Sequence, residues 1–259
     1  MIVAGIDGGS RTLKGVILDR ETGEVLARAV RDQGVEHGRL AEELLRSLLE
    51  EAGLERKDLA AVTATGYARN TISFADFRIT EISCHAAGVV RLFPEVRSIV
   101  EIGGQDSKVI RLGRGGRVLD FAMNDRCAAG TGRFLEMTAV KLEVGLEGLG
   151  RLAGRAGEPS PISSMCVVFA ETEIIGLLAS GGRREDIAAG VMEAMARRVA
   201  AMAGRKLEPP VVFTGGVARV GGFREALERV LGLPVRVPPD PVLTGALGAA
   251  LLGAERAGR

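Results

Sequence analysis

Short apolar runs separated by glycine-containing turns open the chain and are followed by a helical repeat. The runs 2–6, 13–18 and 25–30 are bounded by turn residues, which predicts a β-meander of three strands. Over residues 37–52 the leucines recur at helical spacing, and Gly53 is a typical helix stop. The opening of the chain therefore predicts a sheet with one amphipathic helix against it.

The same kinds of element continue along the chain. We expect a strand at 60–65 and a helix at 81–93, which ends before a proline. Three further apolar runs, at 98–102, 109–112 and 118–122, predict a second meander.

The first two meanders share a sequence pattern. Ile6-Asp7-Gly8-Gly9-Ser10 matches Ile102-Gly103-Gly104-Gln105-Asp106, so we expect the second hairpin to repeat the first after 96 residues. A third strand that ends in glycines follows at 211–217. A repeat over such a distance predicts two related subdomains.

Longer helical stretches fill the second half of the chain. Helices are expected at 128–142, 167–178, 185–202 and 244–255. The stretch 167–178 is apolar almost all round, which indicates a buried helix or one at an interface. Residues 145–161 are rich in Gly, Arg and Pro, and we expect a mobile loop there.

Composition narrows the function classes. The chain has 259 residues, 46% of them hydrophobic, and a net charge of +1, which excludes a disordered chain and gives no reason to expect nucleic acid as a partner. No apolar stretch is long enough for a membrane helix, and the first residues read as a strand, not a signal peptide. Three cysteines, Cys84, Cys127 and Cys166, are too few for a disulfide scaffold. We therefore expect a cytoplasmic protein without a membrane anchor.

Candidate chemistry begins with the three glycine bends. Glycine allows backbone N–H groups to approach an anion, and a carboxylate at a strand end can hold Mg²⁺ through its waters. One such bend alone would be only a hairpin turn, but three of them favour nucleotide binding. The pattern is neither a P-loop nor a dinucleotide fingerprint, since the turn after Asp7 leads into a strand.

Two of the cysteines, Cys127 and Cys166, each precede a predicted helix. A helix N-terminus carries free N–H donors and partial positive charge, which favour a thiolate or an anionic metal centre. A tetranuclear iron–sulfur cluster normally takes four thiolates, so two chains related by a two-fold axis would be needed. Zinc would satisfy the same count. On spacing alone two buried core cysteines are the preferred interpretation, because a gap of 39 residues is no metal-ligand signature.

The three bends resemble the phosphate-1, phosphate-2 and adenosine motifs of the actin, Hsp70 and sugar-kinase ATPase superfamily. That resemblance implies an α/β fold of two subdomains with duplicated ribonuclease-H-like cores around a nucleotide cleft. The first subdomain would be residues 1–96 with 242–259, and the second residues 97–241. It also implies ATP or ADP with Mg²⁺ as ligands.

The superfamily resemblance assigns roles to individual residues. Asp7 would contact phosphate or metal, and Gln105 or Asp106 would position the attacking water. The residues that would bind the nucleotide are Gly8, Gly9, Ser10, Thr12, Lys14, Gly103, Gly104, Gly215, Gly216 and Val217.

The cysteine segments carry a more specific resemblance. Asn124-Asp125-Arg126-Cys127-Ala128-Ala129-Gly130-Thr131-Gly132 and the segment starting at Cys166 resemble the activators of 2-hydroxyacyl-CoA dehydratases, in the BadF/BadG/BcrA/BcrD ATPase family. The resemblance implies an anaerobic homodimer with one [4Fe–4S] cluster, bound by Cys127 and Cys166 of each chain. ATP hydrolysis would drive a low-potential electron to a two-subunit iron–sulfur dehydratase component, and a ferredoxin or flavodoxin would supply the electron. Cys84 and His85 lie outside these ligand segments and are interpreted as structural.

Other functions stay open at this point. The electron acceptor could instead be an aryl-CoA reductase or a double-cubane cluster protein. A small-metabolite kinase of the same fold would need a catalytic base beside an acceptor pocket, and no second polar cluster in the sequence suggests one. An actin-type filament protein would need an extra subdomain, for which 259 residues leave little room.

Overall fold

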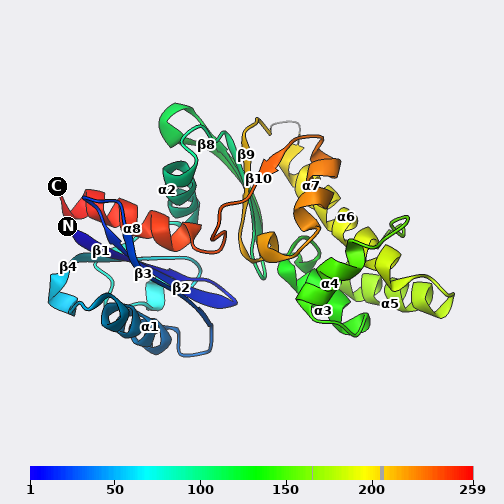
Figure 1. Ribbon diagram of the computed structural model, residues 1–259, viewed down its shortest axis with the longest axis horizontal. Coiled ribbons are helices and arrows are strands. Elements are labelled where there is room, and N and C mark those ends of the chain that lie inside the picture. The colour runs from blue at the N-terminus through cyan, green and yellow to red at the C-terminus, as the bar shows by residue number, and fades with distance from the viewer. Residues whose placement is uncertain (165, 205–206, 259) are drawn as a thin grey trace. The chain divides into compact units, whose positions relative to one another are not determined.

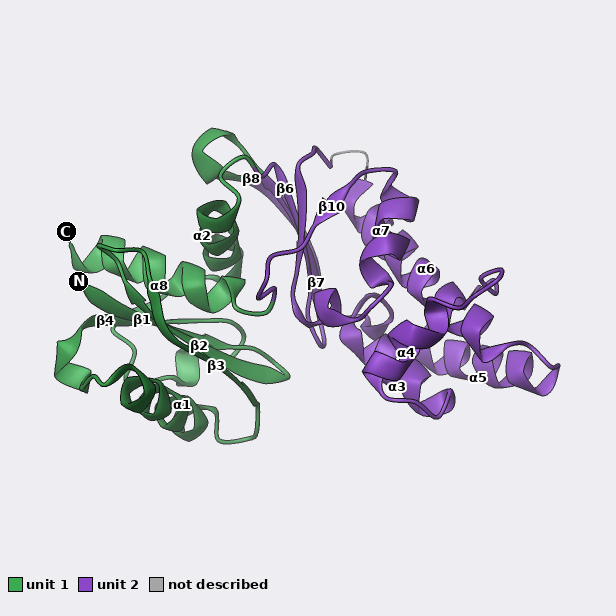
Figure 2. Ribbon diagram, in the orientation of Figure 1, with its two compact units in different colours: residues 1–95, 112–118, 242–259 green, residues 96–111, 119–241 purple. Residues whose placement is uncertain are grey.

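The protein divides into two compact units. The computed structural model describes residues 1–164, 166–204 and 207–258 (Figure 1), so Met165, inside the second cysteine segment, lies outside the described residues. Unit 1 comprises Met1–Glu95, Leu112–Val118 and Val242–Arg259, and unit 2 comprises Val96–Arg111 and Leu119–Pro241 (Figure 2).

Unit 1 is built on a mixed sheet in the order β3-β2-β1-β4-β5. Its strands are β1 (Ile2–Gly8), β2 (Thr12–Asp19), β3 (Val25–Asp32), β4 (Leu59–Thr65) and β5 (Phe77–Arg78). The first three strands form the antiparallel meander that the sequence predicts, and β4 pairs parallel to β1. Helix α1 (His37–Ala52) covers one face with its leucines and ends at Gly53, as predicted.

Two further helices of unit 1, α2 (Glu81–Leu92) and α8 (Thr244–Ala257), pack backbone to backbone. A Cβ atom at Gly248 would collide with the carbonyl oxygen of Cys84, and one at Gly88 would collide with that of Thr244. The small residues of α8 therefore allow this helix to lie flat against both α2 and the sheet.

Unit 2 contains a second mixed sheet, in the order β10-β9-β6-β7-β8. Its strands are β6 (Ser98–Ile102), β7 (Ser107–Leu112), β8 (Val118–Asn124), β9 (Val211–Thr214) and β10 (Val235–Arg236). Strands β6 and β7 form an antiparallel hairpin, and β9 pairs parallel to β6. The central position of β6 in this sheet corresponds to that of β1 in unit 1.

Helices occupy the rest of unit 2. They are α3 (Gly132–Lys141), α4 (Leu146–Ala153), α5 (Val167–Ala179), α6 (Arg184–Ala203) and α7 (Phe223–Leu231). Helix α6 is the core of this half, because it buries Ile187, Val191, Met195 and Val199 against its neighbours. Short 3₁₀ turns lie at Arg56–Asp58, Arg69–Thr71, Arg114–Gly116, Ala128–Gly130 and Gly216–Arg219.

Two predictions about this half were wrong. The stretch 145–161 is not simply a loop, because α4 lies in it and buries Leu149. The helix expected from residue 128 begins only at Gly132, after a 3₁₀ turn and an extended Thr131. Glycines obscured α4, since they are common in loops but serve there for close packing. The start of α3 is displaced because its first amides bond to the turn at Gly103 and Gly104.

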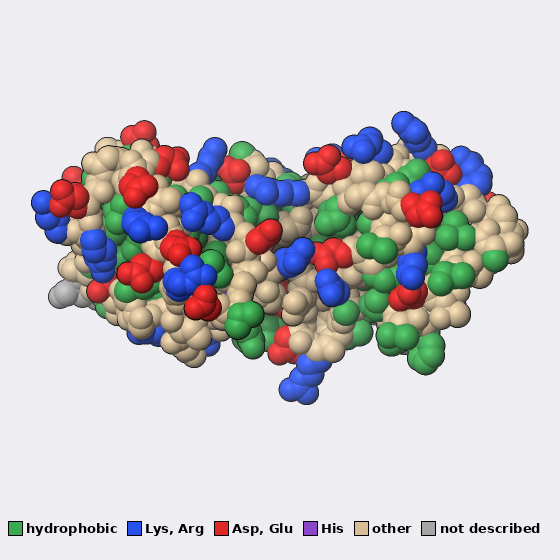
Figure 3. Space-filling model, turned by 90° about the horizontal axis from the view of Figure 1, so that it is seen from below, with side chains coloured by type: hydrophobic (Ala, Val, Ile, Leu, Met, Phe, Trp, Pro, Cys, Tyr) green, Lys and Arg blue, Asp and Glu red, His purple; other side chains and the backbone are tan. Residues whose placement is uncertain are grey.

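Helix α5 exposes much of its apolar surface. Val168 and Phe169 are 68% and 69% exposed, whereas only Ala170 and Ile174 of this helix are buried. Hydrophobic side chains reach the protein surface at several places on the face drawn in Figure 3. In the described parts of the chain, no helix is both long and apolar enough to span a bilayer.

Candidate nucleotide and cluster sites

The first glycine turn joins β1 to β2 and holds an acid–lysine pair. Asp7 lies opposite Lys14 in the strand register, and Lys14 Nζ lies 3.3 Å from Asp7 Oδ2. Asp7 is only 5% exposed. A Cβ atom at Gly9 would lie 2.7 Å from Lys14 Nζ, so glycine at this position leaves space for the ammonium group. This arrangement places one positive group beside the backbone N–H groups of the turn.

Two residues that the sequence analysis missed brace this turn. The side-chain amide of Gln33 donates to the carbonyl oxygen of Gly9 at 3.0 Å. The backbone N–H of Gln33 donates to the carbonyl oxygen of Arg11. Gly66, with φ of +83°, follows β4 and lies against Asp7 Oδ1, where a side chain would collide. Gln33 and Gly66 therefore fix the turn and its carboxylate.

The second glycine turn joins β6 to β7 and contains a more deeply buried charge cluster. Lys108, whose side chain is 2% exposed, donates to Glu101 Oε2 at 2.9 Å and to Asp106 Oδ2 at 2.6 Å. Such a lysine stays charged only because carboxylates accompany it. Glu101 is a further residue that the sequence analysis missed.

The strand register corrects the predicted repeat. Asp7 pairs with Lys14 as Glu101 pairs with Lys108, an offset of 94 residues instead of 96. The turns agree, since Gly9 N–H donates to Thr12 O at 3.1 Å and Gly103 N–H donates to Asp106 O at 2.9 Å. Glu101 is thus the counterpart of Asp7. The acid and the lysine seven residues later were the signal in the sequence that would have found it.

The third bend follows β9, beside β6. Gly215, with φ of +90°, donates its N–H to the carbonyl oxygen of Pro241 at 2.9 Å. A Cβ atom there would lie 2.6 Å from Glu101 Oε1. Gly216 and Val217 continue as a 3₁₀ turn. Unit 2 therefore brings the second and third bends together, as a shared nucleotide site requires.

The N-terminus of α3 is bonded directly to the second turn. Gly132 and Arg133 donate their N–H groups to the carbonyl oxygens of Gly103 and Gly104, both at 2.9 Å. A Cβ atom at Gly132 would lie 3.0 Å from the Gly103 oxygen and 3.4 Å from a methyl of Val217. Two free amides of the helix end are thereby satisfied, and all three segments form one packed unit.

Cys127 lies in a loop that Asn124 closes. The Asn124 amide accepts from Cys127 N–H at 3.0 Å and donates to Cys127 O at 2.7 Å. The residue is exposed and precedes the 3₁₀ turn, so it does not start an α-helix as predicted. The physical reason is that the α3 amides serve the glycine turn. An exposed thiol on a fixed loop can still bind a metal centre.

Cys166 caps α5, as predicted, and is also exposed. The segment before it is held by Glu173, which accepts from the Ser163 N–H, the Ser163 hydroxyl and the Ser164 N–H, each at 2.8 Å. Partial burial opposes ionisation of Glu173, but these hydrogen bonds dominate and lower its pKa to about 2. Glu173 is therefore a fixed anion that orders the approach to Cys166.

The third cysteine belongs to the interior of unit 1. Cys84 is fully buried in α2, and burial raises the pKa of its thiol to about 12. His85 is 6% exposed, and its Nδ1 lies 3.0 Å from the Thr244 hydroxyl in α8. Both environments fit the structural interpretation. Among the described residues, no three His, Cys, Asp or Glu side chains lie close enough together to hold a metal ion.

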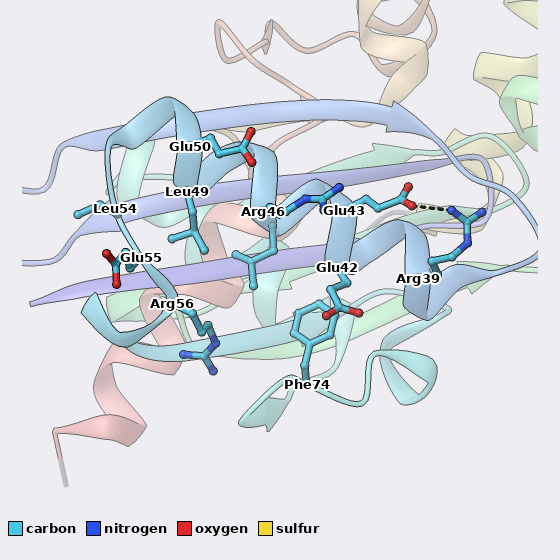
Figure 4. Close-up of a pocket in the computed structure, with 11 residues that line it drawn as sticks. Arg39, Glu42, Glu43, Arg46, Leu49, Glu50, Leu54, Glu55, Arg56 and Phe74 are labelled. Atoms are coloured by element: carbon cyan, nitrogen blue, oxygen red, sulfur yellow. Dashed lines mark hydrogen bonds and ion pairs between the residues drawn. The ribbon is translucent and has the colours of Figure 1, made fainter.

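A groove of about 660 Å³ lies elsewhere in unit 1. It runs beside α1 and is lined by residues of both charges, including the Arg39–Glu43 pair and, on the opposite side, Phe74 (Figure 4). None of the predicted site residues lines it. The candidate nucleotide and metal sites therefore remain the glycine turns and the exposed cysteines.

Two repeated sheets with glycine turns after equivalent strands define an actin-, Hsp70- and sugar-kinase-like ATPase fold, which confirms the predicted fold class. A glucokinase structure from Streptomyces griseus shares this fold at 14% identity, with a TM-score of 0.60. The match covers 98% of this chain and 100% of that one.

The chain belongs to the BadF/BadG/BcrA/BcrD ATPase family, whose model matches residues 4–253. It is 45% identical to the activator of lactoyl-CoA dehydratase from Anaerotignum propionicum, over 99% of both chains. The structure of the 2-hydroxyisocaproyl-CoA dehydratase activator from Clostridium difficile, which contains ADPNP, matches with a TM-score of 0.93 at 42% identity, covering 100% of this chain and 96% of that one. The predicted family is therefore confirmed.

Proposed function

We propose that this protein is an ATP-hydrolysing iron–sulfur protein that delivers a low-potential electron to a 2-hydroxyacyl-CoA dehydratase-type partner. The observation that carries the proposal is the pair of hydrogen bonds from Gly132 and Arg133 to the glycine turn. They join the turn that would bind phosphate to the helix that follows the Cys127 loop. Family membership supports the ATPase half of the proposal.

Each unit would supply one turn for the nucleotide phosphates. In unit 1, Asp7 would hold Mg²⁺ through water, and Lys14 would neutralise phosphate charge. The other unit 1 groups are Gly8, Gly9, Ser10 and Thr12. In unit 2, Gly103 and Gly104 would bind phosphate, while Gly215, Gly216 and Val217 would hold the adenosine.

Among the candidates for positioning the attacking water, Gln105 is better placed than Asp106. Gln105 is exposed at the tip of the turn, whereas the Asp106 carboxylate is bonded to Lys108. An amide at that position can orient a water toward phosphorus. We assign Gln105 this role, and Asp106 and Glu101 the role of setting the charge of the turn through Lys108.

Cys127 and Cys166 would bind one [4Fe–4S] cluster in a homodimer. Two exposed thiols per chain provide four when the chain is doubled by a two-fold axis. Asn124 and Glu173 already order the two ligand segments, which lowers the cost of binding. The exposed Val168 and Phe169 beside Cys166 fit burial against a second chain. Such a cluster supplies one electron at low potential.

The chain's own part in the reaction is to link nucleotide state to the cysteine loops. A phosphate that binds the Gly103–Gly104 backbone and shifts it would also shift α3, because the first two N–H groups of α3 donate to these two residues. Because Phe134 of α3 is fully buried, we expect the helix to shift as a rigid body and to displace the Cys127 loop. A changed loop position alters the hydrogen bonding and solvation that set a cluster potential.

Protein prepared under strict anaerobiosis tests this function. We expect a brown homodimer with four iron and four acid-labile sulfide atoms per dimer, as the cluster type requires, and with ATPase activity. C127S and C166S should remove the chromophore without unfolding, whereas C84A should retain it. Full cluster content in both ligand variants would refute the ligand assignment, and colourless wild-type protein would refute the cluster.

The electron donor and acceptor need a separate experiment. Ferredoxin and flavodoxin are the expected donors, and a two-subunit iron–sulfur dehydratase component is the expected acceptor. Anaerobic co-purification, followed by ATP-dependent electron transfer to the captured protein, would identify the acceptor. Capture of an aryl-CoA reductase or a double-cubane cluster protein would reassign the acceptor and leave the ATPase and cluster in place.

A further inference from the structure

Arg198, in the C-terminal part of α6, links the two cysteine-bearing segments of unit 2. Its Nη2 donates to the carbonyl oxygen of Ser164, two residues before Cys166. A thiolate at Cys127 and the Glu173 carboxylate both lie near enough to act on the guanidinium electrostatically. No pattern in the sequence marks this residue, because arginine is common in the chain and α6 carries no motif.

The guanidinium is held by packing as well as by the hydrogen bond. Its central carbon lies 5.4 Å from the centre of the Phe134 ring of α3, in a cation–π contact. Phe134 itself is fully buried. Arg198 thus contacts the helix that follows Cys127 and the segment that leads to Cys166, and it is fixed against both.

One nitrogen of this fixed guanidinium, Nη1, makes no hydrogen bond within the described residues. This nitrogen is also buried. Leaving a buried charged donor unsatisfied costs roughly 1–3 kcal/mol or more. Burial also lowers the pKa of Arg198, although a Cys127 thiolate and the Glu173 carboxylate act in the opposite direction. A site that tolerates these costs is suited to an anionic group.

We propose that Arg198 is a positioning residue for the cluster: it holds the Cys166 segment through Ser164 and places a positive charge near the anionic centre that Cys127 and Cys166 bind. The inference rests on the proposed function. A positive charge near an iron–sulfur centre favours the more reduced, more negative state. Arg198 therefore raises the midpoint potential and keeps the reduced state accessible to a biological donor.

The test measures iron and sulfide content and the midpoint potential of the isolated dimer without nucleotide. R198M removes both the charge and the donors, and R198Q keeps an amide donor for Ser164 without the charge. R198K keeps the positive charge but lacks the planar guanidinium with its several N–H donors. R197M is the matched control, because Arg197 is 53% exposed and pairs with Glu193 on the same helix. Circular dichroism verifies that each variant is folded.

We expect R198M and R198Q to shift the midpoint potential to more negative values or to lose iron from a folded dimer. R198K should lie between these variants and wild type, and R197M should match wild type. If R198M does not fold, R198Q decides the test. Full iron content with an unchanged potential in the folded neutral variant would overturn the proposal. Wild-type protein without iron would instead refute the cluster itself, so the two failures are distinguishable.

Discussion

Gly132, the first residue of α3, donates its backbone N–H to the carbonyl oxygen of Gly103 at 2.9 Å. The bond joins a helix end to the glycine turn that we propose binds phosphate. Because Arg133 makes the same contact with Gly104, the turn and the helix cannot move independently without loss of both bonds. Backbone hydrogen bonds of this kind are short and directional, which suits them to transmit small displacements.

Replacing Gly132 with alanine should weaken nucleotide binding while leaving cluster content intact. The added Cβ would lie 3.0 Å from the Gly103 oxygen, so the turn has to shift. We expect about a tenfold loss of ATP affinity, or roughly 1.4 kcal/mol, which is near the upper end for one hydrogen bond. Fluorescent-nucleotide titration measures it. G145A is the control, because nothing lies within 4 Å of a Cβ atom there, and it should bind like wild type.

Lys108 should be essential for stability. Its side chain is 2% exposed between two carboxylates, and removing one partner of a buried ion pair typically costs roughly 3–5 kcal/mol. We expect K108M to lower the free energy of unfolding by about 3 kcal/mol, and K108M/E101Q to recover part of the loss because it removes one stranded charge. Urea titration measures both.

The control for Lys108 is a lysine in an exposed pair. Lys57 and Glu55 are 75% and 70% exposed, and such pairs contribute about 0–1 kcal/mol. K57M should therefore unfold with wild-type stability. Equal losses in K57M and K108M would show that the buried cluster has no special energetic role.

Periodicity was enough to predict most of the fold. Leucines at helical spacing and a stop at Gly53 predicted α1 with its observed bounds, because an amphipathic helix against a sheet leaves a clear pattern. Periodicity did not predict helix α4, since Gly148, Gly150 and Gly154 make its segment resemble a loop. Gly150 is there for contact, as a Cβ atom would lie 2.7 Å from the Gly221 oxygen.

The candidate site was predicted by motif, and its supporting residues were not. Glycine turns and cysteines stand out in a sequence, whereas Glu101 and Arg198 acquire their significance only from partners that the fold brings near. Glu101 needs the register of β6 with β7, and Arg198 needs the approach of α6 to the Ser164 segment. Tertiary contacts of this kind leave no local pattern.

The three cysteines should differ sharply in reactivity. Cys127 and Cys166 are exposed, while Cys84 is buried and its pKa is raised to about 12 from the usual 9.0. In native protein freed of metal, we expect two thiols to react quickly with a maleimide at pH 8 and the third to react only after unfolding. C84A should still give two fast thiols. Three fast thiols in the native wild type would contradict the buried environment of Cys84.

The raised pKa of Cys84 also has a consequence for stability. A group whose pKa is higher in the folded state contributes fully below its unfolded pKa, and the contribution is lost as the pH rises. We therefore expect stability to fall between about pH 9 and pH 12 more steeply in wild type than in C84A. Urea titrations at pH 8 and pH 10 compare the two proteins, and identical slopes would show that Cys84 does not contribute.

Glu173 should make the Cys166 segment sensitive to acid. Its pKa is lowered to about 2 from the usual 4.5, so its contribution to stability is complete above about pH 4.5 and is lost as the pH falls toward 2. Protonation removes the acceptor for the Ser163 and Ser164 amides and so releases the segment. We expect wild type to lose more stability between pH 6 and pH 3 than E173Q does, by urea titration. E147Q is the control, because Glu147 is 95% exposed and should leave the acid response unchanged. If E173Q and wild type lose stability equally, Glu173 does not hold the segment through its charge.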